Sequence, residues 1–404
     1  MSGSNHPPTK HLFMKQFIAV VVFIFAGLSL VHAQQNGKKK IAIFAPLYLD
    51  SAFSADGEYR YPSNSMPKFI TPGLEFYQGA QLALDSLSQT GVQLDVTIYD
   101  TRARWQNVDD QLDKAVKNGT SLIIAHCSNN ELRSFADKAR ENKIPVINVN
   151  LPNDGGVSNN PYFVVLNPTL KTQTQGLYDF IKKNYSGSNK QIVFFKKKNN
   201  AEAAIKTMFE DAIKNTPGST VKIKYIDLID SFTVNQLKAQ LDSTKQNICI
   251  VGSFDVNFGN RVIKQLASFS KQYKSVAVGM PTWENLKGLS KPEYKGVEIV
   301  YSNPFHNAKT DKLSQNINQY FTQKMFARPS DMVYRGFEVT WKFAKLLQQY
   351  GSDFNANLTS KNYQLFTDFD IQPVLDNETM TLEYLENKKL YFVKWMDGIV
   401  KQVL

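Results

Sequence analysis

The chain has few of the residues on which hydrolases and metalloproteins depend. Only two cysteines and five histidines occur among 404 residues, and three of the histidines lie in the first 33 positions. No His-Glu-x-x-His, Gly-x-Ser-x-Gly or Gly-x-x-x-x-Gly-Lys motif is present, and the acidic residues lack metal-ligand spacing. His126 adjoins Cys127, but consecutive side chains of a strand point to opposite faces, which argues against a thiol–imidazole pair. The sequence therefore predicts a protein without catalytic activity, bound metal or cofactor.

The scarcity of cysteine also bears on how the fold is held together. Cys127 and Cys249 each lie in an apolar, strand-like run, and we assign these runs to different halves of the molecule. A buried cysteine without a partner behaves as a small hydrophobic residue. We therefore predict two buried thiols rather than one disulfide. The fold then depends on its core, for which 42% of the residues are hydrophobic.

The N-terminus has the pattern of an export signal. Lys15 precedes an apolar run from Phe17 to Val31, and residues 31–33, Val-His-Ala, form a small-x-small cleavage pattern. The run is shorter than the ~20 residues of a membrane-spanning helix, which favours a cleaved signal peptide over residues 1–33 above an uncleaved anchor. No cysteine adjoins the cleavage site. We therefore expect no lipid anchor, and a location in the periplasm or outside the cell.

Basic residues outnumber acidic ones, which gives a net charge of +11. Cleavage after residue 33 removes Lys10 and Lys15 and no acidic residue, so +11 becomes +9. The lysines are scattered apart from runs at 38–40 and 196–198, and no nucleic-acid-binding motif occurs. We therefore expect no nucleic-acid partner and assign the excess charge to a solvated surface.

Strand-like and helix-like runs alternate along the rest of the chain. Strands are expected at 41–47, 93–99, 122–125, 144–149, 191–195, 222–226, 247–252, 275–279, 297–301, 390–394 and 398–403. Helices are expected at 74–87, 108–117, 131–143, 172–184, 202–214, 233–243, 260–269, 311–324 and 331–349. Regular alternation of this kind is typical of a doubly wound parallel sheet.

The number of strands exceeds what one sheet accommodates comfortably, and the pattern restarts near Gln191. We therefore predict an α/β fold of two Rossmann-like lobes with parallel sheets joined by hinge crossovers. Residues 164–168 and 301–304 each end in Asn-Pro, which favours an extended backbone suited to crossing between lobes. The N-terminal lobe is expected to contain residues 38–165 and 303–352. The C-terminal lobe is expected to contain residues 166–302 and 353–404.

The most informative unit runs from Ser121 to Asn150. A buried strand is expected at residues 122–125, and the three residues after Cys127, Ser-Asn-Asn, are types that cap the start of a helix. A second apolar strand ends at polar Asn150. Such a unit places backbone N–H groups and a hydroxyl at the carboxyl edge of a sheet, where open α/β sheets bind small, often anionic, ligands.

From about residue 40 to residue 403 the chain resembles the type I periplasmic solute-binding proteins, especially the branched-chain amino-acid-binding branch. The resemblance rests on the order and spacing of residues 41–46, 73–84, 99–100, 127–128, 144–147, 252–253, 278–279 and 295–299. It implies a two-lobed protein that closes on a small solute and often delivers it to the permease of an ABC transporter. A monomer is expected.

The resemblance also implies one half of a ligand site. The hydroxyl at the position of Ser128 would hold a ligand carboxylate, assisted by Asn129 and the backbone N–H groups at the helix start. The other interpretation of Ser128 is an ordinary helix cap. Asn150 matches a segment that contacts the ligand, although an Asn-Pro turn is the alternative there. Tyr48 and Asp50 match a loop that lines the cleft.

The second lobe would supply the other half. Its expected contacts follow three strand ends and are Asn200, Phe254, Asp255, Thr282 and Trp283. Amino-acid binders of this family place an acid near the position of Pro281, and this chain has proline there, so Glu284 or Asp255 would have to substitute. Trp283 is suited either to stacking on a ligand or to the core.

Two functions therefore remain open. The first is an exported protein that captures a small polar solute, amino-acid-like or other, in an interlobe cleft for an ABC transporter. The second is a sensing or envelope interaction module on the same fold, without a transport role. An exported hydrolase on the same lobes is the least favoured class. The long loop at 51–72, with two tyrosines and three prolines, is a candidate lid over the cleft.

Overall fold

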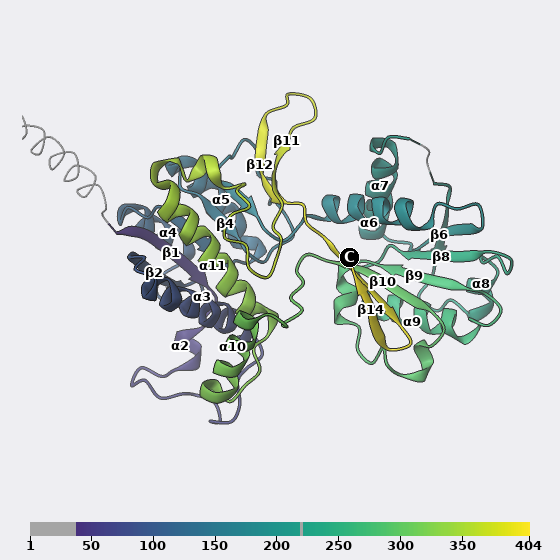
Figure 1. Ribbon diagram of the computed structural model, residues 1–404, viewed down its shortest axis with the longest axis horizontal. Coiled ribbons are helices and arrows are strands. Elements are labelled where there is room, and N and C mark those ends of the chain that lie inside the picture. Colours follow the sequence, from purple (N-terminus) through teal and green to yellow (C-terminus); the bar gives the residue numbers. More distant parts are fainter. Residues whose placement is uncertain (1–37, 219–220) are drawn as a thin grey trace, which may run out of the picture.

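The computed structural model describes residues 38–218 and 221–404, which form two α/β lobes linked by crossing segments (Figure 1). Within these ranges no helix is long and apolar enough to span a membrane. The expected signal peptide lies outside the described residues. The predicted fold class, two lobes built on largely parallel sheets, is confirmed.

The sheet of the first lobe has seven strands in the order β11-β12-β5-β4-β3-β1-β2. Their bounds are β1 (Lys39–Ala45), β2 (Leu94–Asp100), β3 (Leu122–Ala125), β4 (Val146–Asn148), β5 (Phe163–Val165), β11 (Ile371–Leu375) and β12 (Leu382–Asn387). All neighbouring pairs are parallel except β11 and β12. The carboxyl ends of the five central strands therefore meet at one edge of the sheet.

Helices cover both faces of this sheet (Figure 1). Alternate residues of β1 separate the two layers, because successive side chains of a strand point to opposite faces. Ile41 and Ile43 pack with α3 (Thr71–Gln89) and α11 (Asp331–Tyr350). Phe44 packs on the other face with α4 (Val108–Lys117) and α5 (Asn129–Asn142).

The second lobe repeats this plan with the strand order β14-β13-β10-β9-β8-β6-β7. Its strands are β6 (Lys190–Lys197), β7 (Ile223–Leu228), β8 (Gln246–Val251), β9 (Ser275–Gly279), β10 (Glu298–Asn303), β13 (Tyr391–Met396) and β14 (Ile399–Val403). The last two form an antiparallel hairpin at the edge. Helices α6 (Leu170–Tyr185) and α7 (Asn200–Asn215) cover one face, and α8 (Val234–Lys238) and α9 (Val256–Ser268) cover the other.

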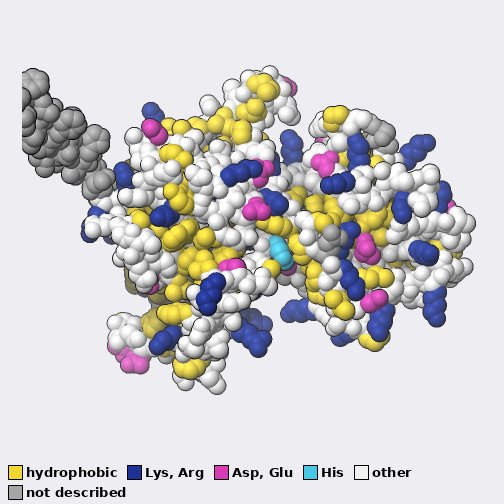
Figure 2. Space-filling view, viewed as in Figure 1, with side chains coloured by type: hydrophobic (Ala, Val, Ile, Leu, Met, Phe, Trp, Pro, Cys, Tyr) yellow, Lys and Arg dark blue, Asp and Glu magenta, His cyan; other side chains and the backbone are white. Residues whose placement is uncertain are grey.

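Short elements complete the chain. They are α2 (Leu49–Ala52), α10 (Lys312–Tyr320), the five-residue turns η1 (Pro281–Asn285) and η3 (Phe321–Met325), and the three-residue turns η2 (Pro292–Tyr294), η4 (Gly351–Asp353) and η5 (Asn355–Asn357). Cys127 and Cys249 are both buried and free, which confirms the prediction of two thiols in separate lobes. In the view of Figure 2, lysine and arginine side chains are spread over both lobes rather than gathered in one patch.

Three segments cross between the lobes, at residues 166–169, 304–311 and 388–390. The first crossing is bonded to the end of β12, directly before the third crossing. The side-chain amide of Asn387 donates to the carbonyl of Leu166 (3.0 Å), and the N–H of Thr169 donates to Glu386 (2.7 Å). These bonds hold the first crossing beside the start of the third.

The structure corrects the expected lobe boundary at the C-terminus. We expected residues 353–404 in the second lobe, but β11 and β12 belong to the first sheet, where β12 pairs with β5. Only the β13–β14 hairpin joins the second sheet. The physical reason lies at the edge of the first sheet. Strand β5 would otherwise expose unpaired backbone groups, which a later strand of the chain covers.

The inner face of α11 carries charged side chains among apolar ones. Glu338 is 3% exposed and accepts hydrogen bonds from the N–H and hydroxyl of Thr367, both at 2.9 Å. Lys342 is fully buried, and its ammonium donates to the carbonyls of Ser360 (2.6 Å) and Asn362 (2.8 Å). These bonds attach the loop at 360–367 to the helix.

Glu338 is expected to make the stability of the protein depend on pH. Burial raises the pKa of Glu338 from 4.5 to about 7, against a lowering effect of the Thr367 bonds. Between these two values the folded state holds a proton that the unfolded state has lost, so stability falls as the pH rises from about 4.5 to 7. Replacing Glu338 by glutamine should remove about 2 kcal/mol of this decline, measured by urea unfolding at pH 5 and pH 7. Exposed Glu378→Gln is the control and should leave the decline unchanged; an equal pH slope in both variants would contradict the assignment.

Candidate functional site

The first loop of the site is held by one carboxylate. Asp100, at the end of β2, accepts the backbone N–H groups of Leu47 (2.9 Å), Tyr48 (3.1 Å) and Leu49 (2.8 Å). It also accepts the N–H of Arg102 (2.9 Å). Tyr48 has a positive φ of 56°, which bulky residues rarely adopt, so the carboxylate stabilises an otherwise unfavourable turn. This turn positions Tyr48 at the carboxyl edge of β1.

The predicted lid is packed against this turn. The ring centres of Phe69 and Tyr48 are 4.8 Å apart, with the rings edge to face, and those of Tyr59 and Tyr61 are 5.6 Å apart. The carboxylate of Asp50 accepts the N–H of Arg104 at 2.8 Å. Asp50 therefore joins the loops that follow β1 and β2, and its expected role as a ligand contact stays a prediction.

Ser128 is the N-cap of α5, as expected, but its backbone N–H is already engaged. It donates to the carboxylate of Glu131 at 2.7 Å, the reciprocal bond of a capping box. Arg102 in turn forms a 2.8 Å ion pair with Glu131. Asn129 is exposed, and its side-chain oxygen accepts from Asn153 at 2.8 Å. The negative charge that a helix start favours is thus supplied by the chain itself.

Asn150 is likewise engaged by its own chain. Its side-chain oxygen accepts the N–H of Cys127 (3.0 Å), and its amide nitrogen donates to the carbonyl of Cys127 (2.9 Å). The two bonds clamp the ends of β3 and β4 together. The backbone N–H groups of Cys127 and Ser128 therefore both have partners within the chain. Ser128 and Asn150 are therefore brought together, with the N–H of Ser128 and the side-chain amide of Asn150 engaged within the chain, and their expected ligand contacts stay predictions.

At the facing edge of the second lobe, three predicted residues lie at helix starts. Asp255 is the N-cap of α9, and its carboxylate accepts two backbone N–H groups and pairs with Lys197 at 2.9 Å. The pairing lowers the pKa of Asp255. Asn200 is the exposed first residue of α7, and Phe254 is 41% exposed beside Asp255. Lys197, which the sequence did not single out, links this edge to Asp230 at 3.1 Å.

The interpretation of Trp283 as a stacking residue is wrong. Its side chain is 0% exposed and lies in the core of the second lobe. Gly259 and Gly279 make room for the indole, because a Cβ at either position would overlap it. Thr282 next to it is partly exposed, and its buried hydroxyl has no partner within the described residues. The expected ligand contact of Thr282 stays a prediction.

The sequence did not single out Arg335 on α11. Its guanidinium carbon lies 3.2 Å from the ring centre of Phe305, and one Nη donates to the carbonyl of Val149 at 3.5 Å. The residue keeps some exposed surface, but its Nε is buried and has no partner among the described residues. The available signal was the spacing of Arg335, Glu338 and Lys342 at i, i+3 and i+7, which puts charges on the same face as the apolar stripe.

His126, at the end of β3, is the second residue of this region. Its Nδ1 is buried without a partner in the described part of the chain. Burial lowers the pKa of His126 to about 4, and the positive charges of Arg335 and Arg102 act in the same direction. The imidazole is therefore neutral at physiological pH and is able to donate or accept one hydrogen bond.

A cavity of about 200 Å³ adjoins Arg335. It lies at the second crossing, where Phe305 and His306 come from the crossing segment, Asn303 from the end of β10, and Tyr334 and Arg335 from α11. Its volume corresponds to about seven water molecules, the size of a small metabolite. Among the described residues no group of three or more histidine, cysteine or acidic side chains is placed to hold a metal ion.

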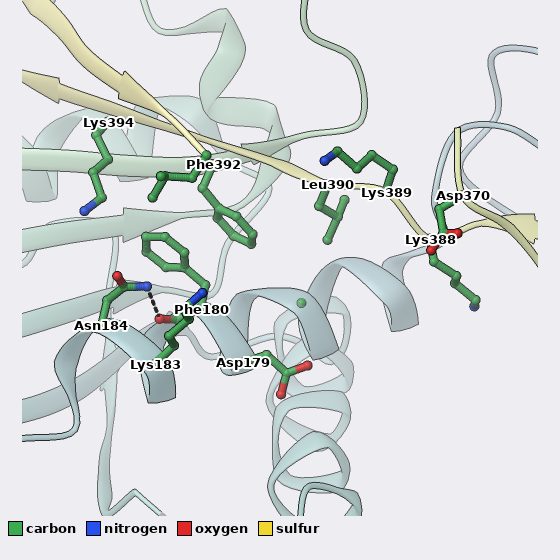
Figure 3. A pocket seen from close by; sticks show the side chains of 12 residues that line it. Asp179, Phe180, Lys183, Asn184, Asp370, Lys388, Lys389, Leu390, Phe392 and Lys394 are labelled. Carbon is green, nitrogen blue, oxygen red and sulfur yellow. Dashed lines mark hydrogen bonds between the residues drawn. The ribbon is translucent and has the colours of Figure 1, made fainter. Parts of the chain in front are cut away.

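A wider cavity of about 600 Å³ lies away from the strand ends, between α6 and the third crossing (Figure 3). Phe180 and Phe392 stack there with ring centres 4.2 Å apart, and Lys183 and Lys394 are at its rim. It opens along the hinge rather than at the carboxyl edges of the sheets. We therefore place the candidate site at the edges and the second crossing.

The chain matches a family model in sequence and several solved proteins in fold. Residues 70–375 match the model of a family described as periplasmic binding protein. No curated protein matches. A solved protein of Rhodospirillum rubrum, provisionally assigned as a branched-chain amino acid ABC transporter, is similar with a TM-score of 0.64 and 11% identity over 90% of this chain and 99% of its own.

Two further solved structures have the same fold. A branched-chain amino acid ABC transporter periplasmic ligand-binding protein of Burkholderia xenovorans gives a TM-score of 0.60 and 13% identity, covering 91% of this chain and 95% of its own. An ABC transporter substrate-binding protein of Desulfitobacterium hafniense in complex with Leu gives a TM-score of 0.54 and 12% identity, covering 91% of this chain and 100% of its own. The chain belongs to the periplasmic binding protein family, whose members bind solutes, and the predicted resemblance is confirmed.

Proposed function

We propose that this chain is an exported, monomeric protein that captures a small polar solute between its lobes and delivers it to the permease of an ABC transporter. The proposal rests on the family match together with the facing carboxyl edges of two parallel sheets. The Desulfitobacterium hafniense protein of the same fold holds leucine. A solute that contacts both lobes would favour a closed arrangement about the three crossings.

The contacts proposed for the solute come from both edges. Tyr48 and Ser128 lie at the first, where the hydroxyl of Ser128 remains a candidate after its N–H is engaged. At the second edge we propose Thr282, which is partly exposed and whose hydroxyl has no partner among the described residues. Nothing in this set supplies a nucleophile with a neighbouring base, so we propose binding without catalysis.

Thermal unfolding of the chain from residue 34 tests the proposal. A solute that binds only the native state at 100 times its Kd adds about 2.7 kcal/mol of stability. We expect a concentration-dependent rise of the melting temperature with at least one member of a panel of amino acids, organic acids, peptides, purines and sugars. Ser128→Ala also removes a helix cap, which lowers the melting temperature of the solute-free protein. We expect the rise caused by the solute, measured from that lower starting temperature, to be smaller in Ser128→Ala than in the unmodified chain. The absence of a response to every solute would overturn the proposal.

A sensing or envelope interaction module is the second candidate. It is favoured by the engaged N–H groups at Cys127 and Ser128 and by proline at position 281, both of which weaken an amino-acid site. Genes for a permease and an ATPase beside the gene for this chain would support transport. Solute binding combined with an absence of such genes would support the module.

A further inference from the structure

Arg335 is a positive charge without a carboxylate partner. No carboxylate oxygen lies within 4 Å of its guanidinium among residues 38–218 and 221–404, and its only hydrogen bond there is the 3.5 Å contact with the carbonyl of Val149. Stacking on Phe305 covers one face of the planar group but leaves the in-plane N–H donors free. Buried charges are normally paired, because an unpaired one loses its hydration without compensation.

The acidic residues around Arg335 do not fill this role. Glu338, Glu284 and Asp331 all raise its pKa, so they are within electrostatic range, but each is bonded elsewhere. Glu338 accepts from Thr367, Glu284 accepts from the amide of Asn303 at 2.9 Å, and Asp331 pairs with Lys309 at 2.8 Å. Burial is the main influence on Arg335 and lowers its pKa to about 10. The group is therefore still charged at neutral pH.

The place of Arg335 in the fold makes it accessible to a solute. It lines the 200 Å³ cavity at the second crossing, and its contact with Val149 brings it to the carboxyl end of β4. The Nδ1 atom of His126 has no partner among the described residues. His126 is close enough to Arg335 for the positive charge of the guanidinium to lower the pKa of the imidazole. Across the cavity, Asn303 ends β10 of the second lobe. An occupant would thus contact residues of both lobes and of the hinge.

We propose that the solute carries a carboxylate and that Arg335 is its anion receptor, in place of the helix start at Ser128. This proposal rests on the proposed function, because it names the class of solute for the same interlobe site. The guanidinium presents parallel N–H donors that match the two oxygens of a carboxylate. The exchange is consistent with the first lobe, where Glu131 and Asn150 accept the N–H groups of Ser128 and Cys127.

The first test needs no knowledge of the solute. Arg335→Met removes an unpaired buried charge while keeping much of the side-chain volume, so the solute-free variant should melt at the same temperature as the unmodified chain or higher. The matched control is Arg133→Met, which removes an exposed arginine paired with Asp137 at 2.9 Å and should shift the melting temperature little. A marked fall of the melting temperature in Arg335→Met alone would show that the arginine is structural and overturn the proposal.

The second test compares acids with their amides. L-leucine, benzoate and succinate are each measured beside leucinamide, benzamide and succinamide by thermal shift and calorimetry. We expect at least one acid to bind, its amide to bind at least 10-fold more weakly, and Arg335→Met to weaken the acid by about 10- to 100-fold. Comparing the affinity for L-leucine with the affinities for benzoate and succinate shows whether the solute is an amino acid or a simple organic acid.

The outcomes distinguish this proposal from the general function. If neutral solutes such as sugars bind and carboxylates do not, or if an acid and its amide bind equally, the Arg335 proposal is wrong and solute binding stands. If no solute of either panel raises the melting temperature, solute binding itself fails and the proposal fails with it. Arg133→Met should bind every responding acid with unchanged affinity.

Discussion

Replacing Asp100 by alanine is expected to lower the stability of the protein by about 3 kcal/mol. The substitution leaves four backbone N–H groups without an acceptor, those of residues 47–49 and of Arg102. Each unpaired group that stays buried costs about 1–3 kcal/mol, and partial access of water reduces the total. Urea unfolding monitored by tryptophan fluorescence measures the loss directly.

Two further variants sharpen this test. Asp100→Asn keeps the oxygen that accepts from Leu47, Tyr48 and Arg102 and replaces only the acceptor of Leu49 by an amide, so about a quarter of the loss is expected. Asp95→Ala removes an exposed carboxylate from the same strand and should have little effect. Equal stability of Asp100→Ala and Asp95→Ala would refute the role of Asp100 in the loop. Any solute response should be weakened in Asp100→Ala, because Tyr48 loses its position.

Gly336→Ala is expected to have a comparable effect, on the order of 3 kcal/mol, through overpacking. Helices α3 and α11 cross closely, and a Cβ on Gly336 would overlap the carbonyl oxygen of Phe76. The reciprocal position, Gly79, would overlap the carbonyl of Val333. Backbone atoms cannot rotate away as a side chain can, so the helices would have to separate. Thermal and urea unfolding of both single variants should show the same direction of change.

A glycine in another helix provides the control. A Cβ on Gly176 of α6 meets only the end of the Leu390 side chain, which can change its rotamer. Alanine also has a higher helix propensity than glycine by about 1 kcal/mol. Gly176→Ala should therefore be nearly neutral. If Gly336→Ala is equally neutral, the close crossing of α3 and α11 is not a constraint on the fold.

Local patterns predicted most of the regular structure. Continuous apolar runs such as 122–125 and 247–252 became central strands, because parallel strands covered on both faces need no alternation of polar residues. The helix start at Ser128 was predicted for the same kind of reason, since a cap depends on residues within one turn. The strand pair β11–β12 was missed because its place depends on β5, more than 200 residues away.

The residues of the candidate site also differ in whether the sequence alone can reveal them. Tyr48, Ser128 and Asp255 follow strand ends, and strand ends can be read from the sequence. Arg335 could not be recognised in this way, because its significance depends on Phe305, Val149 and a cavity assembled from distant segments. Trp283 is the opposite case. It follows a strand end, which made it a candidate ligand contact, but its indole packs in the core against two glycines.

By itself the sequence determined the alternating architecture, the two free thiols and the family, since each depends on composition or on short-range order along the chain. Only the tertiary structure decided which donors at the site are still available. The N–H group of Cys127 is engaged by Asn150, 23 residues along the chain, whereas the guanidinium of Arg335 is left without a carboxylate among the described residues. The physical reason is that a hydrogen bond or an ion pair depends on distance in space, and the partners of these groups lie up to 186 residues apart in the chain.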